Sequence, residues 1–555
     1  MKKQITILAL CFCFLFASIA QAAPFKAVVP TVEDHHYNVK LVINPTSFLG
    51  HGTNGNMFDA NDNYYVGSVS GASTYKVDTK TGEATLFIGP PNGGADDMIF
   101  LEDGTIVWNV FFNGEVYKRT PDGKETLLGT NIAGANAIAL NKEGRVFVTQ
   151  CFFGSALWEI DLSGQQKNRK IWEIPGAGPN GSSFGPDGML YTPLWFKGQI
   201  IKTNVDTGEW SVVVSEGLKV PCAVKFNHKG ELYVADTATG QIYRVDTTNG
   251  QLTLAATVKP HLDNFAFDSQ DRMFVTEMSD NAVWEVNVAT GETRKVTDAS
   301  VVFPNGLAVA PGPDGKDLLY LADNFNYKKI NPYTGDVTVC DNKAAFVDTT
   351  TISDDGKYVL MSAWFTGKVQ VFDRSNDQLL YAIPGFKQAA GTLMLSDGSV
   401  LVAEGTGDIV KVTDKEGKQK TVLADGLQAP TFMAKAADGS AIYVTEYAAG
   451  QITKIDLATG SKQVIAKGLQ SPKGIALDAD GKLIVLEAGT KKLLAINPAN
   501  GKKKVIASHL ASGANIPVKG FGHPAFAFGQ VTISQSGNIY VCADEDNTIY
   551  MFSHK

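Results

Sequence analysis

The sequence has few cysteines for its length. Only 6 of the 555 residues are cysteine, and Cys11 and Cys13 lie in an apolar run at the N-terminus. The other four are too few and too scattered to form a disulfide framework, so apolar packing must hold the fold together. No CxxC or CxxCH motif follows residue 23, which argues against a thiol redox site or an attached haem.

The chain also lacks an excess of positive charge. It has 49 Lys and Arg residues against 57 Asp and Glu, for a formal charge of -8. This balance gives no net positive charge that would attract a nucleic acid or an anionic lipid surface. The GxSxG, HExxH and GxxxxGK[ST] motifs are absent, so serine hydrolases, zincins and P-loop enzymes are not indicated.

One long apolar run is present, and it lies at the start of the chain. Residues 1–23 read MKKQITILALCFCFLFASIAQAA, with two lysines before the apolar run and small residues at its end. This pattern is typical of a secretory signal peptide. No later stretch is long and apolar enough to span a bilayer. We therefore expect a periplasmic or secreted protein with no membrane span after signal cleavage.

The remaining sequence is repetitive. Alternating apolar runs recur with DG, KG, TG or NG turns between them, as in PCAVKFNHKGELYVADTATGQIYRVDTTNGQLTLAA from Pro221 and the similar stretch from Pro472. Each unit predicts a four-stranded antiparallel meander. Twelve such units follow one another about every 42 residues, and the last carries an insertion near His509 to Phe528. A single meander cannot bury both of its faces, whereas neighbours stacked radially form a continuous core.

The predicted fold class is therefore all-β, with two tandem six-bladed β-propellers. The last unit lacks a fourth run, while an unpaired run, YNVKLVI, precedes the first unit. We expect residues 37–43 to supply the outer strand of the sixth blade and residues 292–297 to supply that of the twelfth. The expected domains are a signal peptide at 1–23, a first propeller at 37–290 and a second propeller at 291–555. We call these propellers ring one and ring two.

The repeats resemble NHL-repeat propellers and the six-bladed propellers of the gluconolactonase, paraoxonase and strictosidine-synthase group. The likeness covers nearly all of residues 37–555 and is carried by PNGSSFGPDGMLY at Pro179, ANAIALNKEGRVFV at Ala135 and PNGLAVAPGPDG at Pro304. The resemblance implies a divalent cation, usually calcium, held by Asn and Asp residues at the starts of innermost strands. The same architecture also hosts lyases and binding proteins, so it does not fix the reaction.

Residues that enter the innermost strands converge on the axis of a propeller, and we call these the hub positions. In ring one they are Asn54, Asp96, Asn136, Asn180, Cys222 and Asp263. In ring two they are Asn305, Asp348, Ala390, Thr431, Lys473 and Gly529. The Asn and Asp oxygens of ring one suit a cation such as Ca²⁺, whereas ring two has only two suitable residues and one lysine. The alternative is that Asn and Asp merely favour the turn before a strand.

Three residues near the hub of ring one are candidate catalytic groups. His51 and His261 precede the innermost strands of the first and sixth blades, where an imidazole could deprotonate a metal-bound water. Glu277 follows the second strand of the sixth blade. The alternative for each is an ordinary turn or loop residue.

Aromatic residues form a further candidate site for binding a substrate. Trp108, Phe152, Trp195 and Phe196 are expected to follow the second strands of blades two to four, as are Phe111, Phe112 and Phe153. Three adjacent blades would thus present aromatic side chains to an apolar small molecule, unless these side chains pack between blades.

The sequence thus favours an exported, metal-dependent hydrolase of lactones or esters that acts on a small molecule at the axis of ring one. One alternative is a non-catalytic propeller module that binds a ligand or a protein partner. Another is a lyase of the streptogramin-inactivating kind, although no clear His-Glu-His signature is present.

Overall fold

The computed structural model describes residues 27–44, 46, 50–297, 299–341, 346–514, 516 and 527–555. The predicted signal peptide and part of the insertion in the last unit lie outside these residues. Within the described residues the chain forms eleven four-stranded sheets, one five-stranded sheet and one short 3-10 helix, Ala488–Thr490. No helix among them is long and apolar enough to cross a membrane.

Six of the sheets are the blades of ring one, and each is an antiparallel meander that runs outward from the axis. Blades one to three are β3 (Asn56–Phe58), β4 (Tyr64–Ser68), β5 (Ser73–Val77), β6 (Ala84–Ile88); β7 (Ala95–Phe100), β8 (Ile106–Val110), β9 (Glu115–Arg119), β10 (Glu125–Gly129); β11 (Ala135–Leu140), β12 (Val146–Gln150), β13 (Ala156–Ile160), β14 (Arg169–Glu173). Blades four to six are β15 (Ser183–Phe184), β16 (Leu190–Leu194), β17 (Gln199–Thr203), β18 (Trp210–Val214); β19 (Pro221–Phe226), β20 (Leu232–Asp236), β21 (Gln241–Val245), β22 (Leu252–Thr257); β23 (Leu262–Phe267), β24 (Met273–Glu277), β25 (Ala282–Val286), β26 (Thr293–Thr297).

The other six sheets form ring two, to which the N-terminal segment adds two strands. Blades seven to nine are β27 (Pro304–Pro311), β28 (Asp317–Asp323), β29 (Asn326–Ile330), β30 (Val337–Asp341); β31 (Thr349–Ile352), β32 (Tyr358–Ala363), β33 (Lys368–Asp373), β34 (Leu379–Ile383); β35 (Ala389–Met394), β36 (Val400–Glu404), β37 (Ile409–Val412), β38 (Lys420–Ala424). Blades ten to twelve are β39 (Pro430–Lys435), β40 (Ala441–Glu446), β41 (Gln451–Asp456), β42 (Lys462–Ala466); β43 (Pro472–Leu477), β44 (Leu483–Glu487), β45 (Lys492–Ile496), β46 (Lys503–Ser508), β1 (Thr31–Val32); β47 (Val531–Ile533), β48 (Ile539–Ala543), β49 (Thr548–His554), β2 (Tyr37–Leu41).

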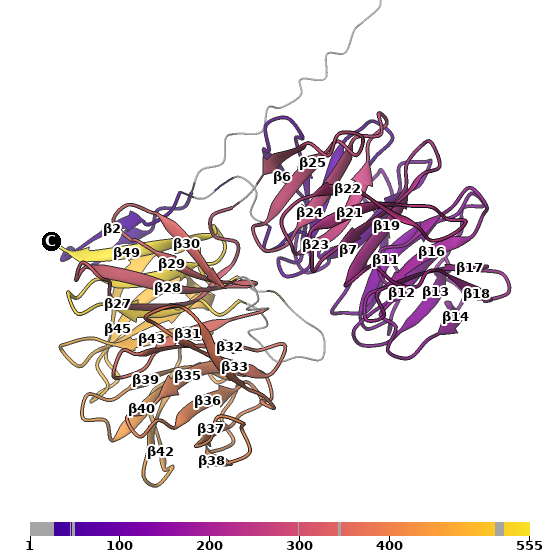
Figure 1. Ribbon diagram of the computed structural model, residues 1–555. Helices are drawn as coiled ribbons and strands as arrows, with labels where there is room; N and C mark the ends of the chain where they lie inside the picture. Colours follow the sequence, from indigo (N-terminus) through magenta and orange to yellow (C-terminus); the bar gives the residue numbers. More distant parts are fainter. Residues whose placement is uncertain are drawn as a thin grey trace, which may run out of the picture.

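The innermost strands close into two rings. In ring one each contacts the next in the order β3, β7, β11, β15, β19, β23, and β23 contacts β3. In ring two the order is β27, β31, β35, β39, β43, β47, and β47 contacts β27. Figure 1 shows the two rings side by side, ring one in purple and magenta and ring two in orange and yellow. The predicted pair of six-bladed propellers is confirmed.

The predicted closure of the rings is wrong. β26, which contains most of residues 292–297, pairs with β25 in its own sixth blade, and β2 pairs with β49 in the twelfth blade. The indigo strand β2 lies beside the yellow strand β49 in Figure 1. Residues 37–41 therefore belong to ring two and not to the expected first propeller at 37–290, while ring one extends to Thr297.

Turn glycines and alternating apolar residues explain each meander. In blade five, Gly230, Gly240 and Gly250 follow strand ends or turns with φ of 76°, 71° and 77°, a conformation that other residues adopt at a cost. Between these turns alternate side chains enter the interface with the next blade, as Val224, Leu232 and Val234 do in one core cluster.

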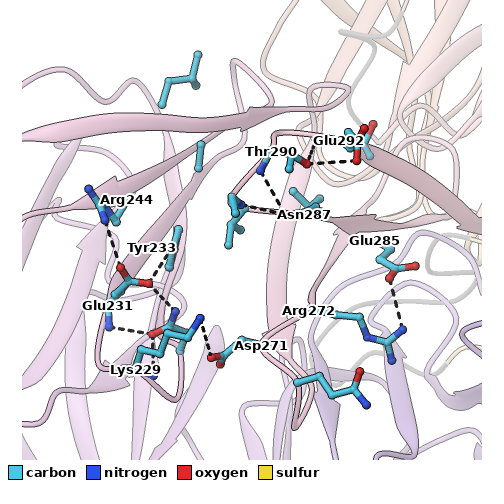
Figure 2. Close-up of a pocket in the computed structure, with 18 of the residues that line it drawn as sticks. Lys229, Glu231, Tyr233, Arg244, Asp271, Arg272, Glu285, Asn287, Thr290 and Glu292 are labelled. Atoms are coloured by element: carbon cyan, nitrogen blue, oxygen red, sulfur yellow. Dashed lines mark hydrogen bonds and ion pairs between the residues drawn. The ribbon is translucent and has the colours of Figure 1, made fainter.

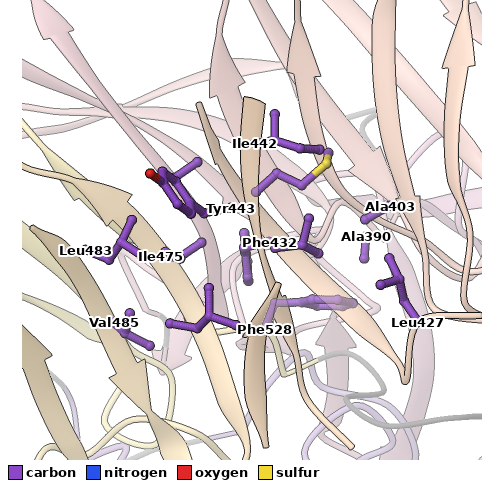
Figure 3. Packing of buried hydrophobic residues seen from close by; sticks show 14 of the residues in the cluster. Ala390, Ala403, Leu427, Phe432, Ile442, Tyr443, Ile475, Leu483, Val485 and Phe528 are labelled. Carbon is purple, nitrogen blue, oxygen red and sulfur yellow. The ribbon is translucent and has the colours of Figure 1, made fainter. Parts of the chain in front are cut away.

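The core of ring two extends from between its blades to its hub. Figure 3 shows part of the largest cluster of buried residues, in which Phe432 and Phe528 lie close to Leu427 and Ala390. Phe432 and Phe528 have ring centroids 6.1 Å apart, and each is almost fully buried. Aromatic side chains from the innermost region of ring two therefore fill the space around its axis.

Candidate functional site

Bulges at the starts of the innermost strands position the hub residues of ring one. The pairing of β7 with β8 shifts register between Ala95 and Met98, and the pairing of β23 with β24 shifts between Leu262 and Phe265. Asp96 and Asp263 lie within these shifts. Extra residues at a bulge change the direction of the side chains around them. The same irregularity recurs at Asn136 and Cys222, so it is a feature of the repeat.

The hub of ring one holds two acidic side chains that influence each other. Burial raises the pKa of Asp96 well above 3.8, and the negative charges of Asp263 and Asp97 raise it further. Burial also raises the pKa of Asp263 to about 7, with the charge of Asp97 adding to this effect and a hydrogen bond with Asn54 opposing it. Both effects disfavour the ionised carboxylates unless a positive charge lies nearby.

Asp97, the neighbour of Asp96, has a cation of its own. Lys225 Nζ lies 3.4 Å from its carboxylate, and the backbone N–H groups of Met98 and Ile138 donate to it at 3.0 and 3.2 Å. Among the described residues, no lysine or arginine forms such an ion pair with Asp96 or Asp263. The described part of the protein therefore offers Asp96 and Asp263 no paired cation, and burial favours their protonated forms until a positive charge binds nearby.

The amide side chains at the hub also have structural tasks. Asn54 Oδ1 accepts from the backbone N–H of Val69 at 2.9 Å, and Asn180 Oδ1 accepts from that of Gly181 at 2.8 Å. The Cys222 thiol donates to the carbonyl of Ala235 at 3.3 Å. Because an amide oxygen has a second lone pair, Asn54 and Asn180 can still act as ligands. Two uncompensated carboxylates beside amide oxygens fit a hard divalent cation.

The structure places the two candidate histidines against ring two. The His51 ring is stacked on Phe303, with ring centroids 3.9 Å apart, and burial lowers its pKa to about 4. Neither ring nitrogen of His51 has a hydrogen-bond partner among the described residues. His261 adopts φ of 75° and its ring centroid lies 6.4 Å from that of Phe325. The sequence did not predict that these histidines would lie next to Phe303 and Phe325, because these neighbours belong to the second propeller.

Glu277 is fully buried and holds its own loop. Its carboxylate accepts from the backbone N–H groups of Ser279 at 2.8 Å and Asp280 at 3.2 Å, and from the Ser279 hydroxyl. Burial and the charge of Asp280 raise its pKa to about 7. Acidic residues in the same repeat position likewise accept from loop N–H groups: Asp236, Asp323, Glu404, Glu446 and Glu487. A repeated structural role therefore accounts for Glu277.

The prediction that Trp108 lines a binding surface is wrong. Its side chain is fully buried between blades one and two, where it packs in a cluster with Tyr65 and stacks on Tyr117, and its Nε1–H donates to the Asn92 carbonyl at 2.6 Å. Trp108 faces inward because it lies inside β8, whereas the other candidates follow the ends of second strands.

Those other aromatic residues join a larger set that crosses from ring one to ring two. We call it the aromatic arc: Phe196, Trp195, Phe152, Phe111, Phe153, Phe112, Phe365, Phe346 and Phe325. Each ring contacts another of the arc, with centroids 5.0–5.9 Å apart. Sequence reasoning missed Phe325, although it follows the second strand of blade seven, and Phe346, which no repeat position marks.

The aromatic arc lies beside the hub of ring one. Cys151 directly precedes Phe152, and the charges of Asp96 and Asp263 help to raise the pKa of its thiol, after the larger effect of burial. Trp195 packs against the cluster that contains the hub residue Cys222. The residues Phe152, Phe153 and Phe196 are 45 %, 42 % and 54 % exposed to solvent. Apolar surface and uncompensated negative charge thus adjoin each other.

A large surface groove lies elsewhere. It has a volume of about 1310 Å³, runs along blades five and six, and is shown in Figure 2. Its charged groups pair with one another, as Arg244 does with Glu231 at 3.2 Å. None of the residues predicted as site residues lines it, so we do not assign the candidate site to this groove.

Comparisons with known proteins agree with this architecture. The profile of a family described as outer membrane protein assembly factor BamB matches residues 197–465, a range that crosses from ring one into ring two. A search of curated proteins finds no significant match. The repeat, which is common to both rings, accounts for a match that ignores the boundary between them.

The solved structures that resemble the chain have low sequence identity and TM-scores below 0.5. A streptogramin B lyase is 16% identical, with 55% of this chain and 98% of that chain covered at a TM-score of 0.39. A gluconolactonase from Xanthomonas campestris is 15% identical, with 46% and 90% covered at 0.37. The extracellular domain of a one-component system from B. thetaiotaomicron is 10% identical, with 93% and 77% covered at 0.33. At these values the likeness concerns the fold and carries no argument about function.

Proposed function

We propose that this protein is an exported double propeller that binds a small ligand at the hub of ring one and on the aromatic arc. In this proposal the hub takes a divalent cation, Ca²⁺ by the preference of its oxygen ligands. Asp96 and Asp263 supply the carboxylates, while Asn54, Asn136 and Asn180 are the amide candidates. Export follows from the N-terminal pattern of residues 1–23.

The aromatic arc is the observation that carries the binding proposal. Three phenyl rings of one surface keep between 42 % and 54 % of their exposure although they touch other aromatic rings. Phe152 also has φ of 62°, which is costly for a side chain of this size. Strain and exposed apolar surface together are unfavourable for folding alone, and a bound apolar group would cover that surface.

Hydrolysis of a lactone or ester at the same hub is the second candidate. It is favoured by the carboxyl groups of Asp96 and Asp263, which can hold a divalent cation beside a substrate. A bound divalent cation would polarise a carbonyl oxygen of such a substrate. Binding is preferred because His51 stacks on Phe303 and Glu277 holds its loop.

Calcium titration of chelator-treated protein, followed by calorimetry, tests the hub. We expect the Asp96→Asn, Asp263→Asn double variant to lose binding. Asp348→Asn is the matched control, because Asp348 is a buried acid at the equivalent position in ring two. Calcium binding that the double variant retains would contradict the hub proposal.

The dye 1-anilinonaphthalene-8-sulfonate can probe the aromatic arc. We expect Phe196→Ala and Phe153→Ala to reduce its fluorescence enhancement, while Trp210→Ala leaves it unchanged. Trp210 is a suitable control because it is 45 % exposed on the outer strand β18, outside the arc. Equal enhancement in all variants would argue against the arc as a binding surface.

A panel of aryl esters and lactones then separates the two candidates. Turnover that requires calcium and disappears in Asp263→Asn would favour hydrolysis. Binding of the same compounds without turnover would favour the binding module.

A further inference from the structure

The N-terminal turn between β1 and β2 brings together three side chains that can ligate a metal. Asp34, His35 and His36 each offer one ligand atom, and these atoms lie within 4.8 Å of one another. The cluster belongs to ring two, where β1 pairs with β46 and β2 pairs with β49.

The turn is held on both sides by different blades. β1 pairs with β46 of blade eleven, and β2 pairs with β49 of blade twelve. Within the turn, the backbone N–H groups of Glu33 and Asp34 both donate to the Ile506 carbonyl, at 2.9 and 3.1 Å. The Tyr37 N–H donates to the Asp34 carbonyl at 3.0 Å. The backbone that carries the three side chains is therefore fixed before any ion binds.

Asp34 is a buried carboxylate that pairs with a lysine. It is 7 % exposed, and Lys504 Nζ lies 2.5 Å from one of its oxygens. The other oxygen lies 2.7 Å from His36 Nδ1. A carboxylate in contact with one ring nitrogen orients the imidazole and raises its basicity as a ligand.

The two histidines remain accessible. The side chain of His36 is 63% exposed, and the ring centroids of His35 and His36 lie 4.1 Å apart. A hollow of about 570 Å³, lined by Asp34, His36 and His554 among others, adjoins the cluster. The space allows an ion to keep water molecules or take a further ligand.

We propose that Asp34, His35 and His36 form a binding site for a divalent transition-metal ion of the zinc type, which braces the N-terminal segment against blades eleven and twelve. Imidazole with one carboxylate suits Zn²⁺, whereas Ca²⁺ prefers oxygen ligands alone. This site is separate from the cation site proposed for the hub of ring one. The two sites can be told apart experimentally, because one is expected to bind Zn²⁺ and the other Ca²⁺.

Zinc titration of the untagged, chelator-treated full chain tests the proposal. We expect the His35→Ala, His36→Ala double variant to lose one equivalent of Zn²⁺ as measured by calorimetry. The matched control is His228→Ala: His228 Nδ1 lies 2.8 Å from Asp271 and the ring is 62% exposed, but no second histidine adjoins it. This control should leave zinc binding unchanged.

A second readout reports the bracing role. Zn²⁺ should raise the temperature at which ring two unfolds in the wild-type chain and in His228→Ala, but not in the double variant. Ca²⁺ should not produce this effect at the N-terminal turn. The proposal is overturned if the wild-type chain binds no Zn²⁺, if the double variant binds it equally well, or if His228→Ala causes the same loss.

Discussion

The two rings are built from the same repeat but differ at their hubs. In ring two Lys473 Nζ donates to the carbonyls of Ala527 at 2.5 Å and Ala514 at 3.3 Å, and lies near the charge of Asp544. The backbone N–H of Phe528 donates to Asn305 Oδ1 at 3.3 Å. Residues of the last unit thus fill this hub and satisfy its polar groups.

In ring one, a lysine of blade five, Lys225, reaches the buried carboxylate of Asp97 in blade two at 3.4 Å. The acidic side chains Asp96 and Asp263 share the hub of this ring with amides and thiols. Buried charges that lack a partner are costly and are characteristic of functional sites. This contrast is the reason that we assign the proposed cation to ring one and not to ring two.

The rings also differ in how they close. A strand from the other end of the chain completes the last blade of ring two. In ring one, side chains join the first and sixth blades: Asn56 Nδ2 donates to the Phe274 carbonyl at 3.2 Å, and Thr53 Oγ1 donates to the Glu277 carbonyl at 2.8 Å. The stability of ring two should therefore depend on its N-terminal strand.

The largest expected effect follows from breaking this strand. Val39→Pro places a proline inside β2, which removes an N–H group and the packing of Val39, at a cost of about 5 kcal/mol. Differential scanning calorimetry should show a large fall in the unfolding temperature of ring two. The matched control is Val296→Pro in β26, also an outer strand with a partly buried valine. It should fray blade six without opening ring one, and equal effects in both rings would contradict the difference in closure.

The next effect concerns pH and the hub of ring one. The pKa of Asp263 is raised from 3.8 to about 7 in the folded state, so the native chain binds more protons than the unfolded chain between these values. Without a cation, the titration of Asp263 alone should lower the stability of ring one by roughly 4 kcal/mol as the pH rises from 4 through 7. Thermal unfolding in chelator measures this loss.

The Asp96→Asn, Asp263→Asn double variant sharpens the comparison, because it removes both hub carboxyl groups that lack a paired cation. Its ring one should lose less stability than the wild-type ring one between pH 4 and pH 7, and the loss that remains belongs to groups such as Glu277, whose pKa is also raised to about 7. Calcium should reduce the pH dependence of the wild-type chain to that of the double variant. A wild-type ring one that becomes more stable as the pH rises would show that the hub carboxylates are already neutralised.

The repeat explains which of these features could be predicted. The turn glycines and the alternation of apolar and polar residues predicted the blades and the hub positions, because both patterns recur in every unit. Closure was missed although β26 follows β25 after a short turn, where local pairing requires less loop-closure entropy than distant pairing. The location of His51 could not be predicted, because its neighbour Phe303 belongs to a different ring and no repeat relates the two.

A smaller effect is expected at the hub of ring two. Lys473→Met removes the cation near Asp544 and leaves the Ala527 and Ala514 carbonyls without this donor. We expect ring two to lose about 2 kcal/mol, measured by chemical denaturation. Ring one and its response to calcium should not change. If Lys473→Met weakened calcium binding, the two hubs would not be independent.

The smallest effect on stability is expected in the aromatic arc. Phe152 has φ of 62° and its side chain is 45 % exposed, so Phe152→Gly relieves backbone strain and removes only part of a packed surface. The change in unfolding free energy should lie within about 1 kcal/mol of zero. Phe111→Ala, in contrast, removes a side chain that is 7 % exposed and should cost about 3 kcal/mol.

If Phe152→Gly proved as destabilising as Phe111→Ala, Phe152 would be part of the core, and strain at this position would not be evidence for a ligand. If Phe152→Gly kept the stability of ring one and lost dye binding, stability and ligand binding would be separate properties of the same strand end.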